Sequence, residues 1–454
     1  MESLLHVVQT INGYLSDYVL IIMLIGAGLY FSIKTRFVQI RCFGEGMRHV
    51  FGNFSLHGGK HESGMSSFQA LTTAIAAQVG TGNIVGACGA ILVGGPGAIF
   101  WMWLIAFFGM ATNYAEAVLA QETRKIDADG TVLGGPVYYI KTAFKGKFGT
   151  FLAVFFSVAI ILALGFMGCM VQSNSIGEAC QNAFGIPSWT VGIAVAVIAS
   201  FIFIGGTNRI AAVTEKIVPV MAILYLLGGL VVLIMRAKYV PETIGMIFKY
   251  AFVPSALIGG GVGEALKIAV SQGAKRGLFS NEAGMGSTPH AHATAKVKDP
   301  CDQGIIAMMG VFIDTFIILT LTALVILSTG VLGNGQTGSE LAQSAFNVGF
   351  GNFGNIFIAL CMLFFAFTTI VGWYYFGEVN VRHLFGNGAV KVYAVIVVIC
   401  VIIGSTLKVD LVWDMADMFN GLMVLPNLIA LLGCLAIVRK LTKKSEKTKK
   451  NNGI

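Results

Sequence analysis

Runs of about twenty apolar residues recur along the whole 454-residue chain, and they constrain its fold more than any other feature. A helix rises 1.5 Å per residue, so such runs have the length needed to cross a hydrocarbon core of about 30 Å. Charged residues make up only 11% of the chain, whereas a soluble domain uses roughly 25% to face water. The 57 glycines fit closely packed membrane helices. The pattern predicts an all-α polytopic membrane protein.

The apolar runs predict about eleven transmembrane helices, of which the seventh is irregular. The expected spans are residues 17–33, 67–93, 97–121, 150–177, 187–204, 212–236, 256–290, 304–329, 353–376, 391–406 and 412–438. Before the first span, Met1-Glu2-Ser3 lacks the basic region of a secretory signal, so we expect no cleaved signal peptide.

The distribution of Lys and Arg predicts the orientation, because cytoplasmic loops carry an excess of both. With the N-terminus outside, most of the 30 basic residues fall on inner segments, including the loop after the first span and the tail at 439–454. The outer segments hold only Arg236, Lys238, Lys249 and Lys408. The net charge of +8 therefore reflects topology. We expect a multi-pass protein of the cell (plasma or inner) membrane, with a cytoplasmic C-terminus and no nucleic-acid partner.

The second span contains a candidate helix break at Gly80-Thr81-Gly82-Asn83, near its middle. Two glycines weaken a helix, and unwinding would free the amides of Thr81 and Gly82 and the carbonyls of Ala76 to Val79. Amides at a helix start attract a carboxylate, and freed carbonyls suit a hard cation such as sodium. Alternatively, the glycines only permit close helix packing.

A second candidate break lies in the seventh span, where the stretch 277–289 is too polar to face lipid as a helix. Irregular backbone at membrane depth persists only where it lines a cavity or is covered by protein. The two breaks are five spans apart, so the segments 67–236 and 256–438 would form two five-helix sets of opposite orientation. This pattern predicts an inverted repeat with a substrate held between the broken helices. The segment 1–60, with the first helix and loop, and the basic tail at 439–454 stand outside the repeat.

Four segments resemble the alanine/glycine:cation symporters, a family with the leucine-transporter-type inverted-repeat fold. They begin with Gln78-Val79-Gly80-Thr81-Gly82-Asn83-Ile84, and the others are residues 134–140, 276–284 and 286–293. The stretch Ser280-Asn281-Glu282-Ala283-Gly284 is the most distinctive. The resemblance extends from about residue 15 to 440, and it implies a carrier for small amino acids.

The resemblance implies a sodium site between the first break and the ninth span. Its ligands would be the hydroxyls of Thr368 and Thr369 and the carbonyls of Ala76, Val79 and Phe365. Five oxygens form a reasonable shell for a hard cation. As an alternative, threonines in membrane helices often bond back to their own i−4 carbonyl.

The resemblance also points the substrate carboxylate at the Thr81 and Gly82 amides and its ammonium at Asn281. Trp373, one helical turn after Thr369, would wall the pocket. The expected substrate-binding residues are Gln78, Gly80, Thr81, Gly82, Asn83, Phe279, Asn281 and Trp373, with Gln172 and Asn174 as weaker candidates, since polar residues commonly bond across packed helices.

Several ionisable side chains lie within or near the spans and need a role, because such groups are expensive in a membrane. Glu282 is expected to pair with Arg276 or Lys275. Asp314 is expected to pair structurally or to act in gating, although as a proton acceptor it would make the coupling ion a proton. His290 and His292 do not share a helix face, so a metal site with Glu282 is not expected. Glu116 is a further ionisable residue inside the predicted spans.

Together these features favour a secondary symporter that imports alanine or glycine with sodium by alternating access. We expect no enzymatic activity, no cofactor beyond the sodium ion, a lipid bilayer as surroundings and a monomer. The alternatives are a proton-coupled transporter of the same fold, a channel or a membrane enzyme. A channel would need a continuous polar file, and an enzyme would need a clustered catalytic set.

Overall fold

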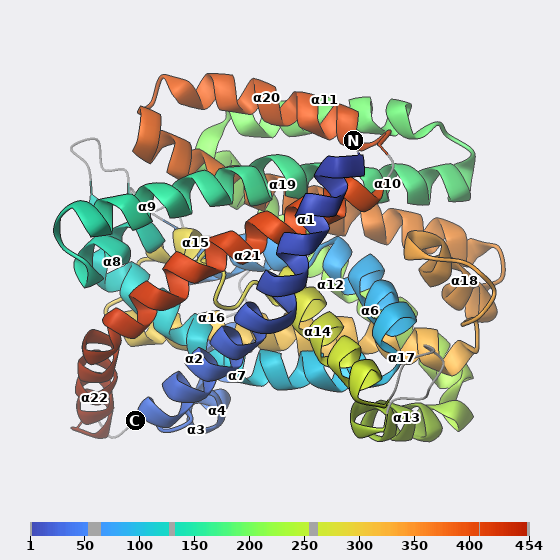
Figure 1. Ribbon diagram of the computed structural model, residues 1–454, viewed down its shortest axis with the longest axis horizontal. Coiled ribbons are helices and arrows are strands. Elements are labelled where there is room, and N and C mark those ends of the chain that lie inside the picture. The colour runs from blue at the N-terminus through green and yellow to red at the C-terminus, as the bar shows by residue number, and fades with distance from the viewer. Residues whose placement is uncertain (1, 53–64, 127–131, 254–261, 408, 452–454) are drawn as a thin grey trace.

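The structure is a computed structural model that describes residues 2–52, 65–126, 132–253, 262–407 and 409–451. Nearly all of the described chain is helical (Figure 1). The first half contains α1 (Glu2–Tyr14), η1 (Leu15–Val19), α2 (Leu20–Lys34), α3 (Val38–Arg41), α4 (Phe43–Phe51), α5 (Ser67–Gln78), η2 (Gly82–Gly86), α6 (Ala87–Gly94), α7 (Gly97–Thr123), the hairpin strands β1 (Lys125–Ile126) and β2 (Val132–Leu133), α8 (Pro136–Ala143), α9 (Gly146–Ile160), η3 (Ile161–Gly168), α10 (Cys169–Phe184), α11 (Ser188–Ile204) and α12 (Gly206–Met235). The second half contains η4 (Ala237–Tyr239), α13 (Val240–Phe252), α14 (Val262–Asn281), α15 (Pro289–Ala293), α16 (Pro300–Val311), η5 (Phe312–Leu319), α17 (Thr320–Thr329), α18 (Gly338–Phe350), α19 (Phe353–Phe385), α20 (Ala389–Gly404), α21 (Val409–Gly433) and α22 (Leu435–Asn451).

Within the described residues, six helical segments are long and apolar enough to cross a membrane unaided: Gly97–Thr123, Gly146–Phe184, Gly206–Met235, Pro300–Thr329, Phe353–Phe385 and Val412–Gly433. Helix α5 and the η2–α6 segment form a further span that is bent by 50°. Helices α2, α11 and α20 are apolar but shorter. Helices therefore occur in every predicted region, although length and composition alone do not establish a count of eleven. The first residues of the seventh predicted span, 256–261, lie outside the described residues.

The two ends of the chain are more helical than the sequence predicts. Helix α1 begins at Glu2, well before the predicted first span. The basic tail is the amphipathic helix α22, which buries Val438, Thr442 and Ser445 along one face. The Thr442 hydroxyl lies 3.0 Å from the hydroxyl of Tyr114 on α7. This buried face, together with the partly buried Leu435 and Leu441, explains why a segment so rich in lysine docks on the bundle.

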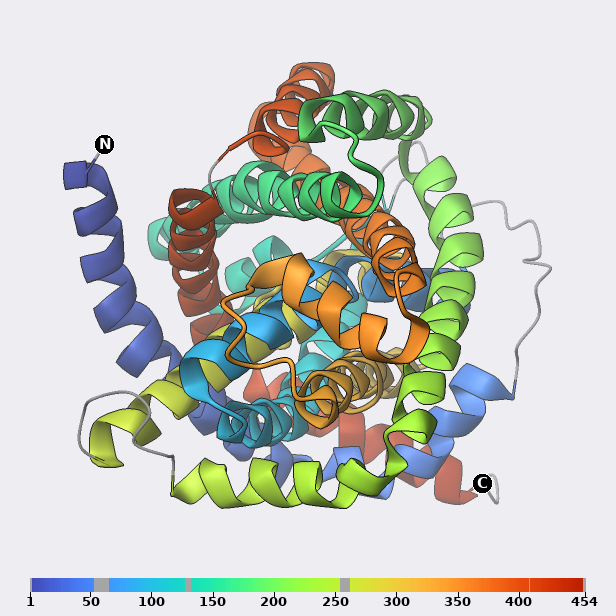
Figure 2. The ribbon, with the colours of Figure 1, turned by 90° about the vertical axis from the view of Figure 1, so that its right-hand side faces the viewer.

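Segments predicted to lie inside gather at one end of the molecule. Lys449 of α22 pairs with Glu45 of α4 and with Asp302 at the start of α16. At the opposite end, the Ser339 hydroxyl of α18 donates to Glu178 of α10 over 2.7 Å. Figure 1 shows α22 and α8 at one end and α13 and α18 at the other. Seen along the long axis, α18 lies over the middle of the bundle (Figure 2). Both α13 and α18 are short helices of 13 residues.

The outer surface is apolar, as a lipid-facing surface requires. Ile204, Ile234 and Val395 are 82%, 72% and 59% exposed. Inside, small residues allow close helix packing. A Cβ atom on Gly304 of α16 would lie 2.7 Å from the ring of Tyr114 on α7, so only glycine fits there.

Candidate functional site

The first predicted helix break is present. Helix α5 ends at Gln78, and Val79 adopts an extended conformation with ψ of 90°. The Gly80 amide, which would bond Ala76 in a continuing helix, instead donates to the Asn83 side-chain oxygen over 3.0 Å. The chain then resumes as η2 and α6. The break thus leaves the Ala76 carbonyl without its usual helical partner.

The second predicted break is also present. Helix α14 ends at Asn281, and α15 begins at Pro289. Between them Glu282, Gly284 and Gly286 have φ angles of 57°, 90° and 79°. Glycine accepts a positive φ at little cost, but Glu282 does not, so other contacts must hold this residue in place.

The two breaks lie against each other in the interior. The Gln78 side-chain amide donates to the Asn281 carbonyl over 2.7 Å. A Cβ atom on Gly82 would lie 3.0 Å from the Cα of Ser280. The interior of the molecule therefore brings the two irregular segments into direct contact, as the inverted-repeat interpretation requires.

Oxygen atoms from both α5 and α19 converge beside the first break. The Thr369 hydroxyl lies 3.0 Å from the Ala76 carbonyl, 3.4 Å from that of Val79 and 3.0 Å from that of Phe365. The Thr368 hydroxyl lies 3.0 Å from the same Phe365 carbonyl. One hydroxyl proton cannot satisfy three carbonyls. The C-terminus of α5 adds the negative end of a helix dipole, so the cluster is strongly electron-rich.

Gly80 sits where no side chain fits. A Cβ atom there would collide with the Thr369 hydroxyl and approach the Gln172 side-chain oxygen to 3.1 Å. The same Gln172 oxygen, from α10, accepts the Thr81 amide over 3.1 Å. The amide that the sequence assigns to a carboxylate therefore has a glutamine partner in this structure.

Three buried polar atoms around the first break have no hydrogen-bond partner among the described residues. They are Gln78 Oε1, Thr81 Oγ1 and Gln172 Nε2. Each residue is at most 1% exposed. Leaving such an atom unsatisfied costs about 1–3 kcal/mol, so a polar ligand bound here would gain interactions.

Aromatic side chains lie beside the two breaks. The Trp373 ring packs on Gly168, where a Cβ atom would be 2.5 Å from it. Phe279 lies 5.6 Å from Trp373 and 4.9 Å from Trp413, measured between ring centroids. Asn281 donates to Thr315 over 3.1 Å, and its oxygen accepts the Ala283 amide over 3.0 Å. Asn281 therefore shapes the second break as well as facing the first.

Glu282 has hydrogen-bond partners other than the predicted Arg276. Its carboxylate accepts hydrogen bonds from the Trp373 indole and the Ser287 hydroxyl, each at 2.5 Å. Arg276 instead pairs with Asp417 of α21 over 3.4 Å. The reason is the left-handed turn at Glu282, which directs its side chain toward α19 and away from the last turn of α14.

The sequence did not predict that Glu116 holds the second break in place; we call this residue the clasp. Glu116 of α7 accepts the amides of Gly284 and Gly286, over 3.1 and 3.0 Å, and the Asn427 side-chain amide over 2.6 Å. The only signal was a glutamate placed in a membrane span, where an ionisable group needs a role.

Asp314 of η5 joins the two breaks. Its carboxylate accepts hydrogen bonds from Asn83 over 2.6 Å, from Ser280 over 2.9 Å and from Thr315 over 2.9 Å. These three partners are all neutral. The sequence predicted a structural or gating role for Asp314 but did not predict that it lies at the contact between the two breaks.

The two histidines have separate surroundings. His290 lies 2.9 Å from the Asn380 amide nitrogen, and His292 lies 2.8 Å from that of Gln303. Asn174, a weaker candidate, donates to the carbonyls of Gly404, the last residue of α20, and of Leu407 beyond it.

The helices and the paired breaks define the leucine-transporter-type fold. The solved structure of MhsT in complex with L-phenylalanine matches 84% of this chain and 100% of its own, with a TM-score of 0.57 and 14% identity. This likeness concerns the fold alone.

The sequence comparisons then identify the family. The sodium:alanine symporter family matches residues 1–453, so the chain belongs to it. The sodium/alanine symporter AgcS of Methanococcus maripaludis is 38% identical over 98% of both chains. The amino-acid carrier protein AlsT of Bacillus subtilis is 42% identical over 96% of this chain and 91% of its own.

Proposed function

We propose that the chain imports a small neutral amino acid, alanine or glycine, together with sodium by alternating access. The observation that carries this proposal is the contact between two broken helices, with unpartnered polar atoms and an oxygen cluster beside it. Family membership and the name of the relative AgcS support both the amino acid and the ion.

The sodium ion would bind between Ala76 O, Val79 O, Phe365 O and the hydroxyls of Thr368 and Thr369. The distances support this assignment, because the three carbonyl oxygens already lie within 3.4 Å of the Thr369 hydroxyl, and the Thr368 hydroxyl lies 3.0 Å from one of them, that of Phe365. Carbonyl and hydroxyl oxygens are the ligands that a hard cation prefers. The threonines also bond carbonyls of α19 itself, the local alternative, but only the Thr369 hydroxyl also reaches α5.

The amino acid would bind along the first break. Its carboxylate would take the amides of Thr81 and Gly82 at the positive end of the η2–α6 helix. Gln172 would exchange its bond to Thr81 for one from its unpartnered Nε2 to the substrate. Gln78, Gly80 and Asn83 hold the break open, Asn281 and Phe279 contribute from the second break, and Trp373 closes the pocket against larger side chains.

We further infer the predicted topology: the N-terminus outside, the C-terminus cytoplasmic, and the segments 67–236 and 256–438 as inverted repeats between 1–60 and 439–454. The grouping of predicted inner segments at one end and outer segments at the other supports it. A monomer in the cell membrane is expected.

Reconstituted protein tests the proposal. Radiolabelled alanine uptake into proteoliposomes should require an inward sodium gradient and should be lost in Thr369→Val and Asn281→Ala. The matched control is Thr329→Val on α17, whose hydroxyl bonds only carbonyls of its own helix. Equal uptake without sodium, or full uptake by Thr369→Val, would refute the assignment of the ion site.

Coupling to a proton is a second candidate, favoured by the burial of Asp314 between neutral partners. Under this alternative, a proton gradient alone would drive uptake, and Asp314→Asn would remove that response. Under sodium coupling, Asp314→Asn would leave the sodium dependence in place.

A further inference from the structure

A groove of about 570 Å³ lies away from the transport site, between the α11–α12 corner and the α19–α20 hairpin. Helices α11 and α20 run side by side along one edge of the molecule (Figure 1). The groove is at the end predicted to be cytoplasmic, because the nearby His383 contacts Lys141 over 3.1 Å. The groove therefore opens toward the inner leaflet.

Most of the surface of the groove is apolar, and several of its aliphatic side chains face outward. Ile204, Val395 and Ile399 are 82%, 59% and 49% exposed. The floor is Phe203 of α11, which stacks on Tyr374 of α19 with centroids 3.6 Å apart. Such a wall at membrane depth suits an acyl chain.

One end of the groove is polar and incompletely satisfied. Glu378 and Arg382, one turn apart on α19, form an ion pair at 2.7 Å, and Lys391 and Asn387 stand beside them. Glu378 is only 3% exposed. Within the described chain, its Oε2 atom and the Arg382 Nε atom are both buried without a hydrogen-bond partner.

We propose that this groove binds a phospholipid whose headgroup carries both a phosphate and an N–H donor, as phosphatidylethanolamine does. The phosphate would accept from Arg382 Nε and lie near Lys391, and the ammonium would donate to Glu378 Oε2. An acyl chain would lie along Ile204, Val395 and Ile399. A choline headgroup has the same charges but no N–H, so it would leave the Glu378 oxygen unsatisfied.

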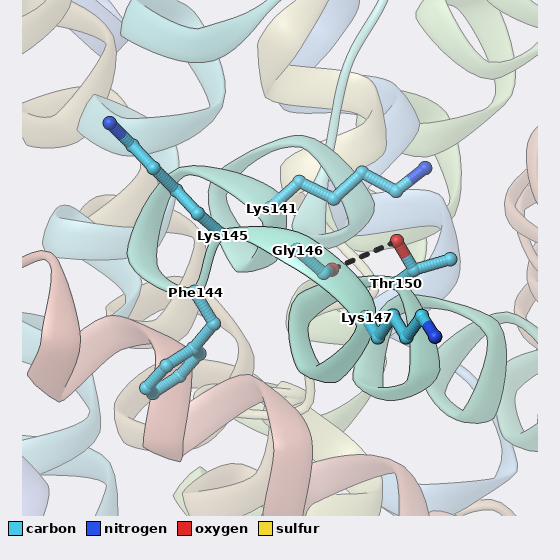
Figure 3. A pocket seen from close by; sticks show the side chains of 6 residues that line it. All are labelled: Lys141, Phe144, Lys145, Gly146, Lys147 and Thr150. Carbon is cyan, nitrogen blue, oxygen red and sulfur yellow. Dashed lines mark hydrogen bonds between the residues drawn. The ribbon is translucent and has the colours of Figure 1, made fainter.

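A second pocket contains lysines but, within the residues that the structure describes, no carboxylate, so it can be compared with the proposed lipid site. It lies at the α8–α9 corner and is lined by Lys141, Phe144, Lys145, Gly146, Lys147 and Thr150 (Figure 3). The Lys145 side chain extends away from those of Lys141 and Lys147. Burial and the nearby Lys125 charge lower the pKa of Lys141, as expected where like charges gather. No carboxylate lines this hollow among the described residues, so it provides a charge-only control.

The test is lipid binding to purified full-length protein in detergent, measured by native mass spectrometry with lipids of identical acyl chains. We expect phosphatidylethanolamine to bind about tenfold more tightly than phosphatidylcholine, the size of one buried charged hydrogen bond. Glu378→Gln should reduce this preference, and Arg382→Gln should weaken binding of both lipids. Lys147→Gln, in the lysine hollow, should leave the preference unchanged.

Equal binding of the two lipids by the unaltered chain would overturn the proposal without any variant, so a misfolded variant does not leave it undecided. Tighter binding of phosphatidylglycerol that is insensitive to Glu378→Gln would also overturn it, because that pattern requires only a negative charge. A preference that Lys147→Gln abolishes would place the lipid in the lysine hollow instead.

Discussion

The two helix breaks contact each other, but they differ in how far their polar atoms are hydrogen-bonded. The first, around Gly80, has polar atoms on Gln78, Thr81 and Gln172 that find no hydrogen-bond partner in the described part of the chain. The second, from Glu282 to Thr288, is satisfied by side chains from three other helices, with Glu116 as the clasp on its amides. We infer that the second break is a rigid platform and that the first responds to ligands.

The energetic reason is that buried polar atoms behave asymmetrically. A satisfied hydrogen bond contributes about 1 kcal/mol, whereas an unsatisfied buried group costs about 1–3 kcal/mol. The first break therefore stores a cost that sodium or substrate could relieve, and the second does not. Changes between Glu282 and Thr288 should affect stability, whereas changes at the first break, or at Asn281 that contacts it, should affect transport.

The largest effect is expected from Glu116→Ala. This change leaves the Gly284 and Gly286 amides and the Asn427 side chain without their acceptor in the interior, so unfolding should become easier by about 3 kcal/mol or more. Thermal unfolding of the purified protein in detergent measures this, with a fall in Tm. The control is Glu122→Ala, an exposed glutamate at the end of the same helix. Equal Tm values for both variants would show that the clasp does not hold the second break.

The sequence predicted the elements of the site whose cause is local. Glycines around Thr81 weaken the helix at that point, and the polar stretch after Asn281 cannot face lipid, so both breaks were foreseen. The resemblance also placed Thr369 opposite Ala76, as the structure does. These relations depend on residue type and on a known family pattern.

The partners that hold the site could not be predicted, because they join helices far apart in the chain. Glu116 and Asn427 are 311 positions apart. Arg276 pairs with Asp417 and not with the predicted Glu282, because the left-handed backbone conformation at Glu282 turns its side chain away. The sequence composition does not predict this conformation. The sequence did not predict helix α22, because its many lysines lower the mean hydropathy of the segment and mask the few residues that it buries.

A smaller effect on stability but a large effect on transport is expected from Gly80→Ala. The added methyl group would collide with Thr369 and crowd Gln172, so it should block sodium binding. Because a displacement of about 1 Å at a binding centre can cost about a hundredfold in rate, alanine uptake should fall by at least that factor. Uptake into proteoliposomes and sodium-dependent thermal shifts measure both properties. Gly89→Ala on α6 is the matched control, since a Cβ atom there meets nothing within 4 Å. Normal uptake by Gly80→Ala would mean that the first break is not the transport site.

The smallest effect is expected from Gln172→Leu, and it separates a ligand-responsive break from a merely irregular one. Without the glutamine, the substrate carboxylate loses one donor but keeps the Thr81 and Gly82 amides. The alanine concentration for half-maximal uptake should therefore rise about tenfold, with little change in maximal rate. Gln181→Leu, an exposed position on the same helix, is the control. Suppose that Gln172→Leu lowers Tm as Glu116→Ala does but leaves alanine affinity unchanged. Gln172 would then stabilise the fold without binding substrate, and the two breaks would have the same structural role. If only the affinity changes, the unpartnered atoms of the first break are the part of the molecule that recognises the substrate.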